Sequence, residues 1–368
     1  MKTLRVALTS LVFAACCAAA AAAQRQNLPE PKLAPSPSTD RQLSLIREGV
    51  SLHDRGDFDG AIRKYEEVLA ENPSDALALY EMGYAYSAKK DYKKALAIAY
   101  RGAQYKSEQL RDFYLLIGNN LDMLGDTAES IEVYKHGLGL FPGEPLLHFN
   151  LAIAYKNAGR LDESRRSAKA ALLANPQHTS SHIVLASLFY NGGYRTPAML
   201  AAARFLTLES GTPRAGAALG MLREVLAGGA RRGANSNEIR VTVEMNPKKD
   251  EGDFTAMETV LGLTAALALS EKEQKKTEAE RLVSQLDRFI SILAEQDAGK
   301  KQDSFTHRFY VPYFVELKQR GYAEAFAYNA LRGSDLPGVR EWLETNSGRV
   351  MQFLIWSKGY NWPADLKP

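Results

Sequence analysis

A small residue recurs through the first half of this chain at intervals of 34 or 35 positions. The positions are Gly49, Gly83, Gly118, Ala152 and Ala186. Twelve positions after each of them comes another small residue, in the order Ala61, Ala95, Ser130, Ser164 and Ala198. Because two sets of positions keep one period and one phase, the pattern indicates a single supersecondary unit repeated five times.

The composition of each repeat predicts two helices that cross closely. Helices can approach one another only where the side chain at the crossing is small, which accounts for glycine and alanine at the repeated position. Proline has no amide hydrogen and ends a helix, and Pro73, Pro142 and Pro176 keep the same period. Ser107 and Ser210 take this place in the second and fifth repeats, so we expect the fifth repeat to be distorted.

This pattern resembles the tetratricopeptide-repeat family, in which each repeat is a pair of antiparallel helices. Tyr86, Tyr134 and Tyr155 lie where the family packs aromatic rings between the helices. The resemblance implies an all-α fold, with a helical solenoid of about five repeats over 42–212. We expect residues 213–237 to form a capping helix and a linker, because a terminal repeat otherwise exposes an apolar face.

The first 23 residues have the order of a secretory signal peptide. Lys2 and Arg5 precede an apolar stretch, which ends in small residues, and we expect cleavage after Ala23. The alternative is a lipid anchor at Cys16, which follows Phe13-Ala14-Ala15. We predict a bacterial periplasmic or secreted protein that is not transmembrane once this segment is removed. Both cysteines lie within the segment, so the mature chain would have no disulfide and no thiol nucleophile.

The charge pattern gives no indication of a nucleic-acid partner. The whole chain has a formal net charge of +3, and its basic residues alternate with acidic ones, as in the run from Lys272 to Lys276. This arrangement is typical of a solvated helix face, whereas a nucleic-acid interface needs a basic stripe.

Two segments outside the repeats have a different character. Residues 24–41 are rich in proline and polar residues, and we expect a disordered linker. Residues 238–368 are expected to form a mainly helical, aromatic-rich domain that holds all three tryptophans. Apolar and polar residues alternate from Ile239 to Met245, which fits either one short strand or an ordered linker. The C-terminal half resembles that of uncharacterised exported proteins with tetratricopeptide repeats.

The sequence shows no catalytic motif and implies no cofactor. We find no Gly-x-Ser-x-Gly elbow, no phosphate-binding glycine loop and no His-Glu-x-x-His zinc motif. His178 and His182 are four residues apart, but His148 precedes His182 by 34 positions and therefore occupies the same place in the previous repeat. We interpret these histidines as packing residues, since no cysteine or carboxylate completes a metal site. The chain is not expected to be an enzyme.

The resemblance implies a partner-binding groove along the first helix of each repeat. Its expected lining is Tyr80, Tyr84, Leu115, Asn119, Phe149, Ile153, Lys156, Asn157, Tyr190 and Asn191. Asparagine can hydrogen-bond the backbone of an extended peptide, and tyrosine and phenylalanine provide rigid contact area. Some family members bind a terminal carboxylate through a lysine and an asparagine one turn apart, but Leu115 stands in the place of that lysine beside Asn119.

The expected function is therefore a scaffold that binds a protein or peptide partner and performs no chemistry. One structural alternative is that residues 211–368 fill the groove from within the chain. One functional alternative is a glycan- or cell-wall-binding factor that uses the aromatic residues of the C-terminal domain. Aromatic residues at helical spacing usually belong to a core, which favours the scaffold.

Overall fold

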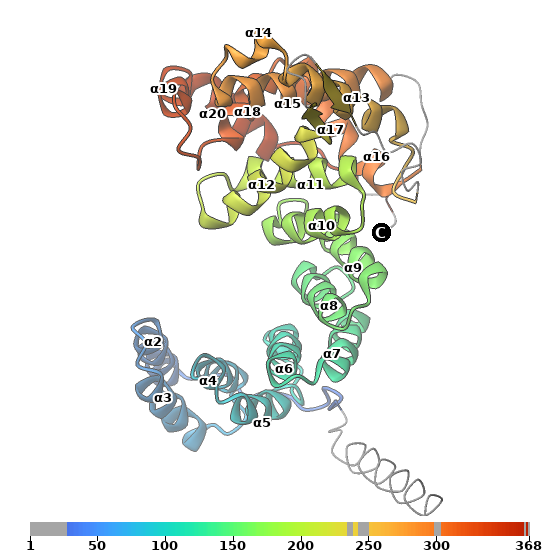
Figure 1. The fold of residues 1–368 in the computed structure, drawn as a ribbon. Coiled ribbons are helices and arrows are strands. Elements are labelled where there is room, and N and C mark those ends of the chain that lie inside the picture. The colour runs from blue at the N-terminus through green and yellow to red at the C-terminus, as the bar shows by residue number, and fades with distance from the viewer. Residues whose placement is uncertain (1–27, 234–237, 242–249, 298–302, 364–365, 367–368) are drawn as a thin grey trace, which may run out of the picture. The chain divides into compact units, whose positions relative to one another are not determined.

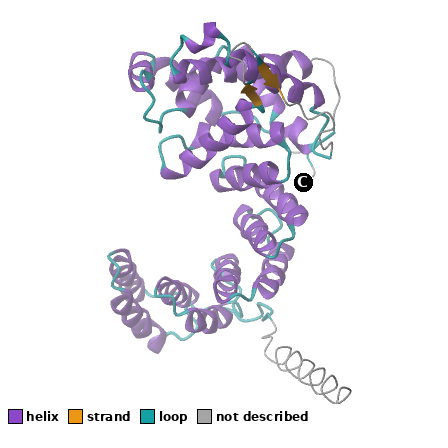
Figure 2. Ribbon diagram, in the orientation of Figure 1, coloured by secondary structure: helices purple, strands orange, loops and turns teal. Residues whose placement is uncertain are grey.

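The computed structural model describes residues 28–233, 238–241, 250–297, 303–363 and 366. The predicted signal peptide and Cys16 lie outside these residues, as does the start of the predicted linker. The chain divides into two compact units, which we call the N-terminal unit (Met1–Val133) and the C-terminal unit (Tyr134–Pro368). The predicted all-α fold with a repeat solenoid is confirmed, and Figure 2 shows helix as the dominant element.

Paired helices make up the five repeats (Figure 1). They are α2 (Asp40–Asp54), α3 (Phe58–Glu71), α4 (Ala76–Ala88), α5 (Tyr92–Gly102), α6 (Leu110–Leu124), α7 (Thr127–Leu140), α8 (Pro145–Asn157), α9 (Leu161–Ala174), α10 (Thr179–Asn191) and α11 (Arg195–Leu208). The even-numbered helices are the first helices of the repeats, and the odd-numbered ones are the second helices. The boundary between the two units falls within α7.

The repeated small residues lie where helices touch. A Cβ atom on Gly49 would come within 2.5 Å of the Tyr65 ring, and one on Gly83 within 2.9 Å of Leu116. In the fourth repeat the Ser164 hydroxyl donates a hydrogen bond to the carbonyl of Ala152, at 2.7 Å. The two small positions of a repeat therefore face each other across its helix pair, which explains their shared period.

The turn inside each repeat also keeps the period. The backbone has positive φ at the five turn positions, which are Gly56, Lys90, Gly125, Gly159 and Gly193. Glycine adopts this conformation without steric cost, and only the second repeat uses a lysine there. The following aspartate begins the second helix of the first repeat, because the Asp57 carboxylate accepts a hydrogen bond from the amide of Gly60 at 2.8 Å.

Residues 28–39 lie against the first repeats within the N-terminal unit. The amide of Leu33 donates to the carbonyl of Gln104 at 2.9 Å, and the carbonyl of Leu33 accepts from the amide of Lys106 at 2.8 Å. Ser38 donates to the carboxylate of Asp75, the N-cap of α4, at 2.6 Å. This part of the expected disordered linker is therefore held by backbone and side-chain hydrogen bonds.

Helices and one strand pair follow the repeats in the C-terminal unit. The helices are α12 (Pro213–Ala227), α13 (Thr255–Ala268), α14 (Glu271–Gln274), α15 (Glu278–Asp297), α16 (Phe305–Phe309), α17 (Val311–Gln319), α18 (Ala323–Ala330), α19 (Val339–Thr345) and α20 (Ser347–Lys358). Strands β1 (Ala230–Arg232) and β2 (Ile239–Val241) pair antiparallel, with Arg231 opposite Arg240. The predicted strand thus has a partner, and residues 242–249 lie outside the described part.

One continuous hydrophobic core runs through the C-terminal unit. It begins in the fourth repeat, at Ala152 and Leu172, and includes most of α11. Aromatic residues of α16, α17 and α20, such as Phe309, Phe314 and Phe353, complete it. In Figure 1, α11 and α12 lie directly against the helices coloured orange and red. The fourth and fifth repeats are therefore merged with the C-terminal helices into one folded body.

Candidate functional site

The structure places the ten predicted binding residues on first helices, but in two separate units. Tyr80 and Tyr84 lie on α4, and Leu115 and Asn119 lie on α6, all in the N-terminal unit. The other six belong to the C-terminal unit, with Phe149, Ile153, Lys156 and Asn157 on α8 and Tyr190 and Asn191 on α10. We call the accessible side of these helices the first-helix face of each unit.

A row of aromatic rings marks the first-helix face of the N-terminal unit. Tyr80 and Tyr84 stack with their ring centroids 6.2 Å apart, at an interplanar angle of 12°. His53, near the end of α2, lies 5.0 Å from Tyr84 and 5.1 Å from Phe58, between centroids. At the other end of the row, Phe113 of α6 meets Tyr80 edge to face at 5.9 Å. Tyr84 remains 46% exposed, so one ring of this row is open to a partner.

Two carboxylates accompany these rings. Asp54 ends α2 with its side chain 72% exposed, and its nearest basic group is the His53 ring at 3.8 Å. Glu81 is partly buried on α4, and this burial, with the nearby charge of Asp54, raises the pKa of the Glu81 carboxyl. Burial also raises the pKa of Tyr80 to about 12, with the charges of Asp112 and Glu81 adding to the effect. The carboxylates of Asp54 and Glu81 therefore lie near the aromatic rings, whereas the charge of Asp112 is paired with Arg111 at 2.9 Å.

The remaining predicted residues of the N-terminal unit lie further along α6. Leu115 is partly buried and Asn119 is exposed. Between α6 and α7, the hydroxyl of Thr127 donates to the carboxylate of Asp122 at 2.8 Å. Leu115 thus provides an apolar surface beside the exposed amide of Asn119. The lysine with which some family members bind a terminal carboxylate is replaced by this leucine.

On the C-terminal unit the first-helix face is mixed in character. Phe149 is partly buried, with its ring edge to face against His178 at 4.9 Å between centroids, and Ile153 is also partly buried. Lys156, Asn157, Tyr190 and Asn191 are exposed. Tyr190 donates a hydrogen bond to Glu224 of α12, which fixes the direction of its ring. This face therefore offers a basic group and amides around an apolar centre.

The C-terminal helices cover a different side of the fourth and fifth repeats. Lys169 of α9 binds Glu251 at 2.6 Å, and Thr196 of α11 donates to Glu258 at 2.7 Å. Lys169 and Thr196 both lie on second helices. On the first helix α10, the buried His182 also bonds this part of the chain, through the hydroxyl of Tyr310. The first-helix face of α8 and α10 is thus left accessible.

His182 has a packing role. Its Nε2 atom lies 3.0 Å from the carbonyl of Pro176, which can only accept, so Nε2 carries the proton. Nδ1 then accepts a hydrogen bond from the hydroxyl of Tyr310, at 2.8 Å. Complete burial, aided by the charge of Arg204, lowers the pKa of His182 to about 3. No group of three metal-binding side chains occurs among the described residues.

Most aromatic residues of the C-terminal helices pack against one another. Tyr313 stacks on Trp356 at 5.0 Å and on Trp362 at 5.2 Å, and the indole nitrogen of Trp356 donates to Glu316 at 3.0 Å. Trp342 stacks on Tyr328 with centroids 4.0 Å apart. All three tryptophans are partly buried, and their ring faces are stacked on other aromatic rings at the edge of the core, so the structure gives no support to a glycan cleft built from all three.

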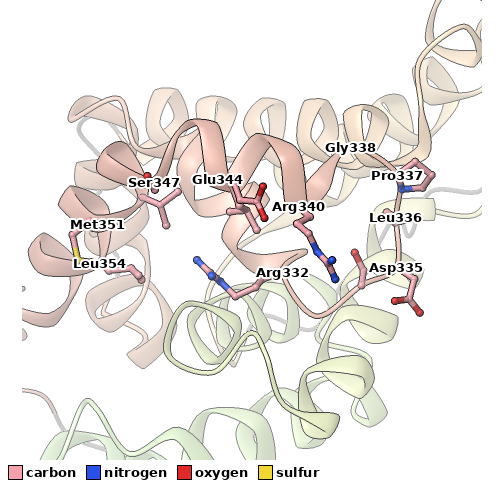
Figure 3. Close-up of a pocket in the computed structure, with 13 residues that line it drawn as sticks. Arg332, Asp335, Leu336, Pro337, Gly338, Arg340, Glu344, Ser347, Met351 and Leu354 are labelled. Atoms are coloured by element: carbon pink, nitrogen blue, oxygen red, sulfur yellow. The ribbon is translucent and has the colours of Figure 1, made fainter.

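A pocket that the sequence did not predict lies between the loop that follows α18 and the helices α19 and α20. It has a volume of about 880 Å³, and Figure 3 shows Arg332, Arg340 and Glu344 around it. The floor is apolar and includes Leu343, Val350, Met351 and Leu354. Its residues come from a loop and two short helices with no repeat period, so no sequence pattern marked them. Positive and negative groups share the rim, and the pocket favours no one ligand class.

Comparison with known proteins identifies the repeats. Two sequence models described as tetratricopeptide repeat match residues 46–110 and 123–188. The TPR repeat-containing protein MJ1428 of Methanocaldococcus jannaschii is 27% identical over 119 residues, which cover 32% of this chain and 21% of that protein. Cellulose synthase 2 operon protein C of Komagataeibacter xylinus is 27% identical over 140 residues, which cover 38% of this chain and 11% of that protein. The chain therefore spans a small part of the length of these relatives.

Solved structures also match the repeats. A thermophilic TPR protein of Thermus thermophilus is 21% identical, with a TM-score of 0.41, and the match covers 50% of this chain and 97% of that one. MamA from Desulfovibrio magneticus RS-1 is 17% identical, with a TM-score of 0.39, over 50% of this chain and 97% of that one. Within the described residues, no helix is both long and apolar enough to cross a membrane.

Proposed function

Because this chain is a tetratricopeptide-repeat protein, we propose that it is an exported, non-catalytic scaffold of the bacterial cell envelope that binds a segment of a partner protein. The observation that carries the proposal is the accessible first-helix face of each unit, with exposed Tyr84 in one and exposed Lys156, Asn157 and Tyr190 in the other. Repeat solenoids use such surfaces to bind extended peptides, through aromatic contact area and amide hydrogen bonds.

Three features support this function. The C-terminal helices bind the second helices α9 and α11, and where residues 211–368 reach the first helix α10, through Glu224 on Tyr190, the Tyr190 side chain is still exposed. The family is generally non-enzymatic. The cell-envelope setting rests on the order of residues 1–23, in which basic, apolar and small residues follow one another.

Site-specific cross-linking in cells tests the binding surface. A photoreactive amino acid replaces Tyr84 or Phe149 in the full chain, and in control proteins it replaces Tyr92 of α5 or Leu161 of α9, on second helices. We expect Tyr84 and Phe149 each to yield an adduct with a partner protein, identified by mass spectrometry, and the two controls to yield none. Adducts that form equally well from Tyr92 and Leu161 would contradict the proposal.

A second measurement tests export. The mature protein is recovered from the envelope fraction and its N-terminal peptide is identified by mass spectrometry. We expect a chain that begins at Gln24, whereas a lipid-modified Cys16 would show the alternative anchor. A chain that retains Met1 and is found in the cytoplasmic fraction would contradict the envelope assignment. The binding surface would then still be tested by the cross-linking result.

A further inference from the structure

The aromatic row of the N-terminal unit adjoins two carboxylates that lack a strong cationic partner. Some other carboxylates of this unit have one, since Asp59 pairs with Lys89 and Glu48 pairs with Lys64. Glu81 has neither a hydrogen bond nor an ion pair in the described part of the chain. Asp54 has only the His53 ring, 3.8 Å away. The charges of these two carboxylates are therefore largely uncompensated.

A buried hydroxyl in the same region also lacks a partner. Tyr65 is fully buried beneath α2, and within the described residues its hydroxyl makes no hydrogen bond. Burial raises the pKa of this hydroxyl, and the charges of Glu81 and Asp54 raise it further. An unpartnered buried polar group of this kind is rare in a folded protein and calls for an explanation. The hydroxyl of Tyr65 thus adds a polar group without a partner to the two carboxylates of this region.

The stacked tyrosines add a second type of recognition. The face of an aromatic ring attracts a cation, and the attraction is strongest where a carboxylate can contact the same group. Tyr84 is exposed, stands three residues after Glu81, and is therefore on the same side of α4. A cationic side chain that lies over Tyr84 can direct its charge toward Glu81 and Asp54.

We propose that the face formed by Asp54, Glu81 and Tyr84 binds a lysine or arginine side chain of the partner segment. The inference rests on the proposed function and defines its partner as a basic segment of a protein. Charge complementarity favours this occupant, because an acidic or apolar segment would leave both carboxylates unpaired and more deeply buried. Tyr80, which is partly exposed and is backed by the buried ring of Phe113, gives the neighbouring residues of such a segment an apolar contact.

Peptide binding to the full chain tests this inference. The probe is a fluorescein-labelled ten-residue peptide of alternating lysine and alanine, and the matched peptides carry acetyl-lysine or glutamate in place of lysine. Binding is followed by fluorescence anisotropy at low salt. We expect the lysine peptide to bind at least roughly tenfold more tightly than either matched peptide, because both lack the positive charge.

Substitutions locate the site. Glu81→Gln is expected to weaken binding of the lysine peptide roughly tenfold, and Tyr84→Ala roughly fivefold. The control is Glu66→Gln, which removes the same charge from an exposed position on the second helix α3 and is expected to change affinity less than twofold, because solvent and salt screen it. Equal losses from Glu66→Gln and Glu81→Gln would overturn the inference, since only the net charge would then matter.

The two experiments separate the inference from the function on which it rests. If a partner cross-links at Tyr84 but Glu81→Gln leaves its adduct and its peptide affinity unchanged, the cationic site is wrong and the scaffold function stands. If no partner cross-links at Tyr84 or Phe149, the scaffold function is wrong, whatever the peptide result. Equal binding of the acetyl-lysine peptide would also overturn the cationic site.

Discussion

The two units use the same repeat in different ways. In the N-terminal unit most side-chain hydrogen bonds join residues that are close in sequence. Even the hydrogen bond from Ser74 to Ser36 spans only 38 positions. In the C-terminal unit Lys169 binds Glu251 across 82 positions, and Arg204 binds Ser357 across 153. The first three repeats are thus stabilised mainly by their neighbours, as in an ordinary solenoid, whereas the fourth and fifth depend on a distant part of the chain.

The charged groups show the same contrast. Ion pairs of the N-terminal unit, such as Lys89 with Asp59, are exposed and contribute little to stability. The side chains of Lys169 and Glu251 are only 10% and 4% exposed, so their pairing is required once both are buried. The packing of the C-terminal unit therefore depends on buried polar contacts. In the N-terminal unit, the carboxylates without a strong cationic partner, Asp54 and Glu81, lie on the accessible face.

Arg204 is where the C-terminal unit should be most sensitive to substitution. Its guanidinium is fully buried and donates to Tyr313 and Ser357 at 3.1 and 2.6 Å, and to Gln177 at 2.9 Å. It also lies 4.8 Å from the Tyr313 ring centroid and 5.0 Å from that of Trp362. Arg204→Ala removes these contacts and opens a cavity, and we expect the free energy of unfolding to fall by about 4 kcal/mol.

Urea unfolding monitored by tryptophan fluorescence measures this loss, because all three tryptophans lie in the C-terminal unit. The control is Arg160→Ala in the same unit, where the arginine is exposed and pairs with Glu163. We expect a loss below about 1 kcal/mol for the control. Similar losses for the two variants would show that the buried guanidinium does not hold α11 to the C-terminal helices.

The second largest expected effect on the free energy of unfolding is its dependence on pH. The buried ring of His182 has a pKa of about 3, whereas in the unfolded chain a histidine has its ordinary pKa near 6.5. Between these values the unfolded chain binds a proton that the folded chain does not, so stability falls as the pH is lowered. From pH 7 to pH 5 the loss from this residue is about 2 kcal/mol.

The same fluorescence measurement, repeated at pH 5 and pH 7, tests this prediction. His182→Gln keeps a polar group for Tyr310 and has no titrating ring, so its stability should differ less between the two pH values, by about 2 kcal/mol. The comparison is made within each protein, which removes any constant effect of the substitution. An unchanged pH dependence in His182→Gln would assign the acid sensitivity to other groups of the unit.

The repeats could be predicted from the sequence because their cause is local and periodic. Gly49 and Gly83 mark helix crossings, and the turn glycines mark the reversal between the two helices of a repeat. Each requirement applies to a few adjacent residues and returns every 34 or 35 positions, so it is visible without any knowledge of the tertiary structure.

The polar contacts of the C-terminal unit could not be predicted in this way. Lys169 has the sequence context of a solvated helix residue, and nothing near it indicates a partner 82 positions away. The division of the chain inside α7 and the pocket at α19 and α20 likewise depend on which helices meet. In the candidate site, Glu81 could have been predicted from the sequence, because it lies about one helical turn before Tyr84. Asp54 and Tyr65 could not, because they belong to the preceding repeat.

The smallest expected effect concerns the accessible face of the N-terminal unit. Burial and the charge of Asp54 raise the pKa of Glu81 above its usual value, so the folded chain loses stability as the pH rises through that pKa. Glu81→Gln removes this penalty. At pH 7 we expect the variant to be more stable by less than about 1 kcal/mol, since the group is partly exposed and screened by solvent.

Hydrogen exchange followed by mass spectrometry can detect a change of this size locally. Peptides from α2 to α4 should exchange more slowly in Glu81→Gln than in the parent at pH 7, and the difference should shrink at pH 5, where more of the parent carboxyl is protonated. Glu66→Gln should leave the same peptides unchanged. If Glu81→Gln weakens the binding of a basic peptide and also slows exchange in its own helices, this carboxylate is retained for recognition rather than for folding. Faster exchange in Glu81→Gln would show that the carboxylate stabilises the fold.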